Sequence, residues 1–269
     1  MKDSHSASVA ERDGTRPQWG PTPVPNDQMT SFSFGPLRLE VDRRKFEWRV
    51  HAIRTPNSNG PPTSLRWNEP DPTLRFTTSE TNGELTWKPA LADRAVVARP
   101  ETPVYVLAGD TASLYISTPL WVQCFVRENS DLPLHEFASV LLSDTWFGDL
   151  EGDGELCYAA RTNARTLAES TLRKPTRALT PVHVRNRGKK NLLVQRIKLP
   201  LPFLRLYIDD HHVLWTDPLR LVAADDGTIE VEPRRDAPPQ EAVSATLIAG
   251  ARNHSTGNVV TRTLGALLR

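Results

Sequence analysis

Residues 45–52 read KFEWRVHA, and polarity alternates at every position of this stretch. The apolar members are Phe46, Trp48, Val50 and Ala52, and the polar members are Lys45, Glu47, Arg49 and His51. A period of two places these sets on opposite faces of a β-strand. The stretch therefore predicts a strand in a sheet that has one buried and one solvent-exposed face.

Similar short runs recur along the chain, separated in many places by Gly, Pro, Asn or Asp. They lie at residues 37–41, 74–78, 84–87, 104–107, 113–117, 120–126, 181–185, 191–199, 203–208, 213–215, 228–232 and 242–251. Helical signals are confined to residues 135–142, 163–172 and 264–269. Many short strands at this spacing predict an all-β protein with little helix, either a large antiparallel β-sandwich or two packed sandwich-like lobes.

Two details concern the connections in the second half. Residues 181–185 and 191–199 flank a turn at 186–190, in which Gly188 can supply a positive φ angle. Pro200 and Pro202 cannot donate backbone hydrogen bonds, so they interrupt the strand ladder. We therefore expect the chain to cross from one sheet to another at these prolines.

The chain has 269 residues, of which 23 are proline, more than the roughly 5% of an average protein. Residues 1–30 are polar and proline-rich, which predicts a disordered tail with Trp19 as a short docking element. Residues 31–269 form the expected β-rich globular unit, with a division into two lobes near 163–174.

The cellular compartment is predicted from two sequence features, a signal peptide and a membrane span, that we do not find. The N-terminus has no apolar run of signal-peptide length, and no stretch of 18 apolar residues occurs anywhere in the chain. These features predict a soluble cytoplasmic protein. Cys124 and Cys157 are then expected to be reduced, small core residues rather than a disulfide.

A family resemblance rests on several blocks between residues 144 and 216. These are Trp146-Phe147-Gly148, residues 154–159 (GELCYA), 177–182 (RALTPV), 184–186 (VRN), Arg196-Ile197, 199–202 (LPLP) and 214–216 (LWT). Over roughly residues 100–220 the chain resembles an uncharacterised archaeal and bacterial family catalogued as a domain of unknown function. The resemblance implies an all-β cytosolic protein and assigns no functional residues.

An acidic loop is the first candidate site. Asp144, Asp149, Glu151, Asp153 and Glu155 provide carboxylates on one short segment, as calcium prefers. Asp149, Glu151, Asp153 and Gly154 match the first positions of an EF-hand loop, but Ala160 stands where the bidentate Glu is required. We therefore weigh a non-EF-hand metal site at Asp149, Glu151, Asp153 and Glu155 against a solvated β-turn or a partner for Arg residues, and the failed match favours these alternatives.

A basic segment is the second candidate. Residues 161–198 contain eleven Lys or Arg and the single acid Glu169, so the segment carries +10 within a chain whose net charge is +1. The predicted anion-binding residues are Arg173, Lys174, Arg177, Arg185, Arg187, Lys189, Lys190 and Arg196. The alternative, which we favour, is that neighbouring acids neutralise these charges in surface pairs.

Other motifs restrict the function further. No Phe, Trp or Tyr lies within 161–198, so sequence-specific nucleic-acid binding is not expected. The chain has no Gly-x-Ser-x-Gly, P-loop or dinucleotide-binding motif, and it suggests no cofactor. Residues 209–212 (DDHH) are interpreted as a turn rather than a transition-metal site, and Trp67 is the best candidate for an exposed aromatic ring.

Three functional hypotheses follow. The first is a non-catalytic interaction module that binds another protein, with a membrane surface or a polyanion as alternative partners of the basic segment. The second is an enzyme or ligand-binding barrel that holds a small anionic molecule through Arg residues. The third is a calcium-dependent module that uses the 144–155 loop.

Overall fold

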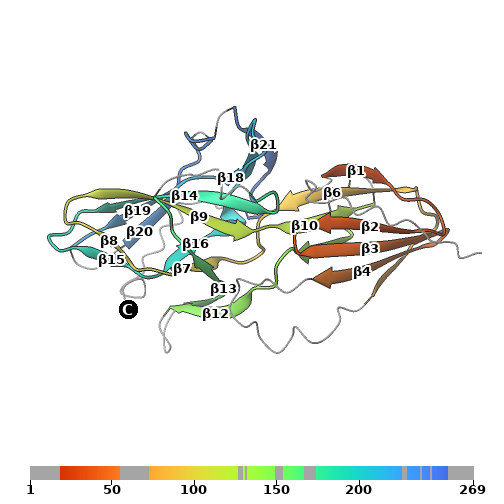
Figure 1. The fold of residues 1–269 in the computed structure, drawn as a ribbon, viewed down its shortest axis with the longest axis horizontal. Coiled ribbons are helices and arrows are strands. Elements are labelled where there is room, and N and C mark those ends of the chain that lie inside the picture. Colours follow the sequence, from red (N-terminus) through yellow and green to blue (C-terminus); the bar gives the residue numbers. More distant parts are fainter. Residues whose placement is uncertain are drawn as a thin grey trace, which may run out of the picture.

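The computed structural model describes residues 19–54, 73–126, 130, 132–148, 154–166, 174–225, 229–236, 238–242 and 244–253. These residues form an elongated, nearly all-β molecule with a single 3₁₀ turn, η3 (Leu201–Phe203). Figure 1 shows two lobes along the long axis. The prediction of an all-β protein is confirmed, and none of the described residues forms an α-helix.

The N-terminal lobe consists of two four-stranded sheets. The first has the order β2 (Met29–Phe34), β3 (Leu37–Arg44), β4 (Glu47–Arg54) and β5 (Leu74–Thr77). The second has the order β1 (Gly20–Pro23), β6 (Glu84–Ala90), β10 (Trp121–Phe125) and β11 (His135–Ala138). All pairings in both sheets are antiparallel.

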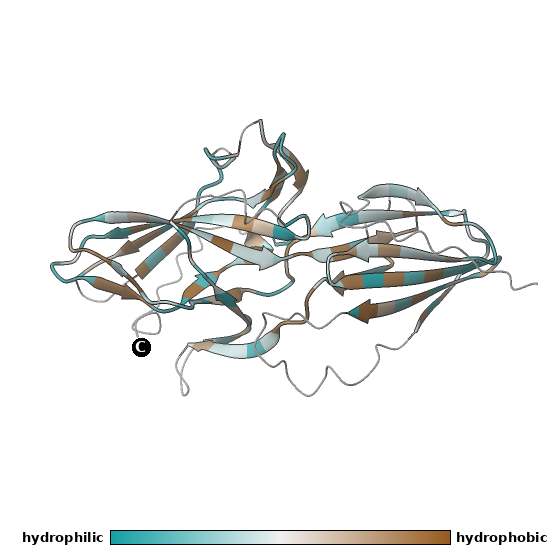
Figure 2. Ribbon diagram, viewed as in Figure 1, coloured by the Kyte–Doolittle hydropathy of each residue, from teal (hydrophilic) through white to brown (hydrophobic). Residues whose placement is uncertain are grey.

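The core of this lobe follows the predicted alternation. In β4, Trp48, Val50 and Ala52 are buried, and the residues between them are only partly buried. Figure 2 shows the same banding of apolar and polar residues along the strands. Phe46 departs from the pattern: it lies in the two-residue turn between β3 and β4 and is 54% exposed. Pairing of Arg44 with Glu47 leaves Phe46 outside the sheet.

The C-terminal lobe contains the remaining sheets. One has the order β12 (Ser143–Gly148), β13 (Gly154–Thr162), β7 (Val96–Pro100) and β16 (Ile197–Leu199), and a two-stranded sheet pairs β15 (Leu192–Val194) with β8 (Val104–Val106). The largest has the order β20 (Ile229–Pro233), β19 (Leu219–Ala223), β14 (Arg177–Asn186), β18 (Leu214–Thr216), β17 (Leu206–Ile208) and β21 (Thr246–Ala249), with β9 (Thr111–Pro119) also paired to β14. Three pairings are parallel: β13 with β7, and β14 with both β18 and β19.

Two strands run from one lobe into the other. In β6, Trp87 packs in the apolar cluster of the N-terminal lobe, whereas Ala90 belongs to that of the C-terminal lobe. In β10, Cys124 packs in the cluster of the N-terminal lobe, and Trp121 packs in that of the C-terminal lobe. The expected division near 163–174 lies largely outside the described residues, and the adjoining positions Ala164 and Ala178 share one cluster.

The N-terminal segment departs from the predicted tail within its described part. Residues 1–18 lie outside the described residues, but β1 and the start of β2 fall within 19–30. Trp19 packs against Phe34 with ring centroids 5.0 Å apart. The reason is that β1 pairs along β6, so its backbone hydrogen bonds are satisfied despite two prolines. Trp19 is therefore part of the core packing.

Three local predictions are corrected and one is confirmed. Residues 135–138 form strand β11 rather than a helix, because they pair with β10 and bury Phe137. The predicted strand 191–199 divides into β15 and β16, which join different sheets, and Gly188 does not have a positive φ angle. The crossover at Pro200 and Pro202 is confirmed, since η3 links β16 to β17 in another sheet. No helix among the described residues is long and apolar enough to cross a membrane.

Candidate anion-binding site

Three arginines lie side by side on adjacent strands of the C-terminal lobe. Arg161 of β13 is the direct register partner of Arg99 of β7. Arg196 immediately precedes Ile197, the residue of β16 that pairs with Ala98. Paired residues of a sheet project from the same face. Arg161, Arg99 and Arg196 therefore form a row across β13, β7 and β16, which we call the arginine row.

The arginine row is a concentration of like charge. Partial burial and repulsion by Arg196 and Arg161 lower the pKa of the Arg99 guanidinium, and no carboxylate acts in the opposite direction. None of the three guanidiniums forms an ion pair or hydrogen bond with another described residue. Arginine is always charged at neutral pH, so the row keeps its full positive charge. An anion would relieve this repulsion.

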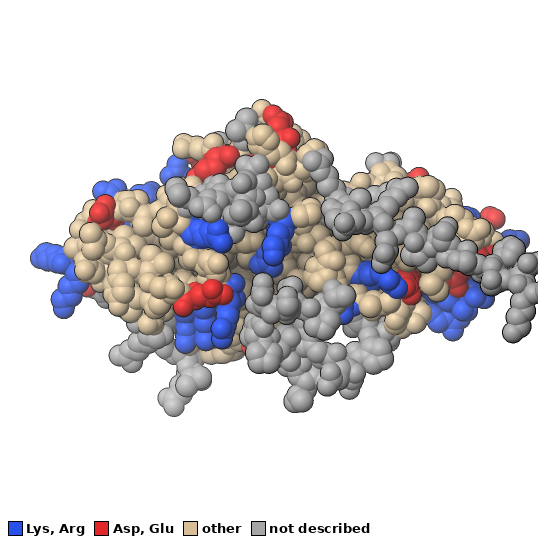
Figure 3. Space-filling view, viewed as in Figure 1, with Lys and Arg blue, Asp and Glu red and all other residues tan. Residues whose placement is uncertain are grey.

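The backbone beneath the row is held rigidly. Ala98 and Ile197 are fully buried on the opposite face, in the main apolar cluster. The Glu101 amide donates to the Thr162 carbonyl at 2.9 Å, which extends the β7–β13 pairing past the arginines. Figure 3 shows separate patches of Lys and Arg side chains around the region where Figure 1 places β7, β13 and β16, with an acidic patch between them. The row is thus a surface feature on a fixed scaffold.

The predicted anion-binding residues do not form one site. Arg196 joins the arginine row, and Arg173 lies outside the described residues. Lys174, Arg185, Arg187, Lys189 and Lys190 are exposed. The last three follow β14 in the loop that leads to β15, where the Lys189 amide donates to the Asp225 carboxylate at 2.6 Å.

Arg177 was among the predicted anion-binding residues, but its guanidinium is bound to Ser117 of the neighbouring strand. Its Nε donates to Ser117 Oγ at 2.8 Å, and its terminal nitrogen donates to the Ser117 carbonyl at 2.7 Å. Burial lowers the pKa of its guanidinium to about 10. Arg177 therefore ties β14 to β9 and supports the fold.

Neutralisation of the basic segment is seen at Lys198. Its Nζ lies 2.5 Å from Glu155 Oε1, and it also lies over the Phe147 ring at 5.4 Å. Cys157 Sγ donates to the same Glu155 oxygen at 3.3 Å, and burial raises the Cys157 pKa to about 12. Cys157 is thus an unreactive, buried thiol at neutral pH.

Two metal sites were considered from the sequence, the acidic loop and residues 209–212. Of the predicted calcium ligands, Glu155 is engaged by Lys198, whereas Asp149, Glu151 and Asp153 lie outside the described residues. No cluster of three potential metal ligands occurs in the part of the chain that the structure describes. At 209–212, the predicted turn is present: the Asp209 carboxylate accepts the amides of His211 and Val213 and the Trp215 indole N–H.

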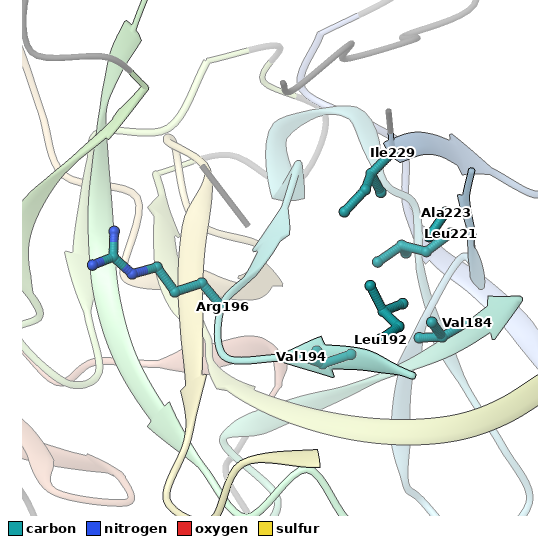
Figure 4. A pocket seen from close by; sticks show the side chains of 7 residues that line it. All are labelled: Val184, Leu192, Val194, Arg196, Leu221, Ala223 and Ile229. Atoms are coloured by element: carbon teal, nitrogen blue, oxygen red, sulfur yellow. The ribbon is translucent and has the colours of Figure 1, made fainter. Parts of the chain in front are cut away.

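A small cavity beside the row is apolar. It has a volume of about 10 Å³ and lies among Val184, Leu192, Val194, Leu221, Ala223 and Ile229. Figure 4 shows these aliphatic side chains facing one another, whereas the Arg196 guanidinium points away across the neighbouring strand. Such a space is too small for a ligand. Any anion bound by Arg196 must therefore lie on the outer surface.

A serine and a histidine also meet on the large sheet. Ser113 Oγ lies 3.0 Å from His183 Nδ1, because the two residues are register partners on β9 and β14. A catalytic triad would need a carboxylate that orients the other imidazole nitrogen. No described carboxylate hydrogen-bonds to His183. We interpret the contact as an ordinary cross-strand pair.

These features define an all-β protein with an arginine row on its C-terminal lobe. Residues 18–268 match the family model described as "Protein of unknown function (DUF432)", and the chain belongs to this family. This agrees with the resemblance that the sequence blocks suggested. No curated protein and no solved structure matches the chain.

Sequence reasoning found only part of the row. Arg161 was included in the basic segment but not among the anion-binding residues, and Arg99 lies far from that segment. Their contact depends on parallel pairing of β7 with β13, which are separated by five other strands in chain order. No local motif signals such a pairing, so Arg99 could not have been selected from the sequence.

Proposed function

We propose that the protein is a non-catalytic module that binds a phosphate-bearing anion at the arginine row. The observation that supports this most strongly is the row itself: three guanidiniums on adjacent strands, without a carboxylate partner among the described residues. A guanidinium presents its N–H donors in a planar fork that matches two oxygens of a phosphate. Three such groups in one row favour a multiply charged ligand.

The spacing of the row suggests the size of the anion. Neighbouring strands lie about 4.8 Å apart, so the backbone positions of the outer two arginines lie about 10 Å apart. This exceeds the width of one phosphate group. A ligand with several linked phosphates can contact all three side chains, whereas orthophosphate satisfies fewer. We therefore expect an oligophosphate to bind more tightly than a single phosphate.

Binding is favoured over catalysis because of what surrounds the guanidiniums. Within the described ranges, no histidine, carboxylate or hydroxyl group hydrogen-bonds to Arg99, Arg161 or Arg196. A general base or nucleophile would have to lie within hydrogen-bond reach of the bound ligand. These contacts support the binding of an anion, and we assign no catalytic group among the described residues.

Isothermal titration calorimetry with sodium tripolyphosphate at low ionic strength tests the proposal. Low salt is required because the site is exposed and its charges are screened over about 10 Å at 0.1 M salt. We expect saturable binding to the wild type and weaker binding of orthophosphate. The Arg99→Gln variant should bind at least about tenfold more weakly, since a charge-assisted hydrogen bond contributes about 1.5 to 3 kcal/mol.

Arg185→Gln is the matched control. Arg185 is an exposed arginine on β14 of the same lobe, so its replacement changes the net charge equally without touching the row. We expect its affinity to stay close to that of the wild type. Equal weakening by the two variants would indicate nonspecific attraction, and absence of binding to the wild type would also refute the proposal.

A further inference from the structure

A larger cavity, of about 280 Å³, lies where the two lobes meet. The N-terminal lobe contributes residues in and after β6 and in β10, and the C-terminal lobe contributes residues around η3, β17 and β21. The lining consists of Lys88, Pro89, Ala90, Leu91, Gln123, Leu204, Leu206, Ile248, Ala249, Gly250 and Arg252. Small-molecule sites occur preferentially at such boundaries between structural units.

The wall of this cavity is mostly apolar. Leu91, Leu204 and Leu206 are at most 4% exposed and belong to the main apolar cluster, against which Ile248 and Ala249 pack. Because the core holds these side chains, the wall is formed before any ligand arrives. An apolar wall with a few polar groups is typical of a site for a small organic molecule.

The charged side chains of the lining are already engaged. Arg252 donates to both Glu136 oxygens at 2.9 and 2.7 Å, and its Nε donates to the Leu91 carbonyl at 2.8 Å. Lys88 Nζ lies 4.7 Å from the centroid of the Phe125 ring, and Lys88 has a further interaction partner. An ionic ligand would have to lose its hydration and compete with these partners, which costs free energy. The lining therefore favours an uncharged ligand.

Gln123 provides a neutral polar group. It is the register partner of Glu136, and its Nε2 donates to Glu136 Oε1 at 2.5 Å. The carboxylate fixes the orientation of the amide, because the NH₂ group is the only donor of this side chain. The amide oxygen therefore faces away from Glu136, and as an acceptor it suits the hydroxyl group of a ligand.

We propose that this cavity binds a small uncharged alcohol with an apolar body. The body would lie on Leu204, Leu206 and Ile248, and the hydroxyl group would donate to the Gln123 amide oxygen. An apolar cavity of roughly 150 Å³ holds benzene, so about 280 Å³ has room for a substituted ring. This site is separate from the arginine row, and its test does not depend on oligophosphate binding.

An NMR titration of the isotope-labelled protein with 2-phenylethanol tests this inference. We expect saturable shifts of the Gln123 side-chain amide and of the backbone amides of residues 248–250, which line the cavity. Phenylacetate and 2-phenylethylammonium carry the same ring with a negative or a positive charge. Each should bind at least about tenfold more weakly than the alcohol, because an ion must be desolvated.

Gln123→Leu removes the proposed acceptor and keeps an apolar wall. It should weaken 2-phenylethanol binding about two- to tenfold, the loss expected for a neutral hydrogen bond. Gln195→Leu is the matched control, since Gln195 lies between β15 and β16 and does not line the cavity. We expect the Gln195→Leu protein to bind 2-phenylethanol as the wild type does.

A further variant fills the space directly. Ala249→Phe should abolish 2-phenylethanol binding while circular dichroism retains the β signal. If this variant does not fold, the three ligands and the two glutamine variants still decide. The inference is wrong if the wild type shows no saturable shifts at the lining residues, or if either ion binds as tightly as the alcohol. It is equally wrong if both glutamine variants bind alike, or if a folded Ala249→Phe protein binds normally.

Discussion

Asp217 is completely buried, and hydrogen bonds from two residues stabilise its charge. Its carboxylate accepts the Arg205 backbone amide at 2.8 Å, the Arg205 guanidinium at 2.8 and 3.0 Å, and the Tyr207 hydroxyl at 3.0 Å. Burial and the neighbouring carboxylate raise the Tyr207 pKa to about 12, so the phenol stays a donor. A buried charge is tolerated only with such partners.

Removing this carboxylate should therefore be costly. We expect Asp217→Ala to lower the free energy of unfolding by about 3 to 5 kcal/mol, since it breaks a buried pair and leaves Tyr207 without its acceptor. Urea unfolding followed by circular dichroism measures the loss. Asp236→Ala removes a carboxylate that is 67% exposed and pairs with Arg234, and should cost about 1 kcal/mol or less. Equal losses would contradict this interpretation of Asp217.

Glu47 makes stability depend on pH. Hydrogen bonds from Arg75 and then Arg49 lower its pKa from 4.5 to about 2. A folded-state pKa below the unfolded value means that the stabilisation is complete above pH 4.5 and is lost as the pH falls toward 2. The wild type should lose more stability across this window than Glu47→Gln. Parallel curves of melting temperature against pH for the two proteins would be inconsistent with this role.

At the scale of elements, the β12–β13 hairpin shows how one glycine positions a large side chain. A Cβ atom added to Gly154 would lie 2.4 Å from the Trp146 ring. Trp146 is 45% exposed, beside Leu156, its register partner, which is 50% exposed. The indole therefore covers the glycine backbone, and its outer part meets solvent.

Gly154→Ala should push the Trp146 ring into solvent. We expect a red shift of tryptophan fluorescence, with a stability loss of about 1 kcal/mol or less because the ring is already 45% exposed. Gly250→Ala is the control, since a Cβ there meets no atom within 4 Å. An unchanged emission spectrum for Gly154→Ala would show that the ring does not rest on this glycine.

The positions of the strands could be predicted from the sequence better than their partners. Alternation identified β4 and its buried Trp48, and prolines identified the crossover after β16, because both signals are local. Strand partners were not predictable. Residues 186–190 resemble a hairpin turn, yet β15 pairs with β8 because the register of distant strands determines the sheet. The Asn186 side-chain amide donates to the carbonyls of Val106, Leu107 and Lys190, which holds the 186–190 loop against β8.

On the scale of the whole molecule, the basic segment does not act as one surface. The sheet topology assigns Arg177 to core support, Lys198 to an ion pair and Lys189 and Lys190 to an exposed loop. Among the described residues of this segment, Arg161 and Arg196 alone join Arg99 in the row. The basic segment therefore contains two of the three arginines of the row, of which only Arg196 was among the predicted anion-binding residues, and long-range strand pairing determines which charges meet.

We propose the arginine row as the anion site of this protein. A crystal structure of the protein soaked in tungstate, a heavy-atom analogue of phosphate, tests it most directly. We predict anomalous density in contact with Arg99, Arg161 and Arg196, with the three guanidiniums turned toward it. Density only at the loop of Lys189 and Lys190, or carboxylates paired with the three arginines in the crystal, would contradict the claim.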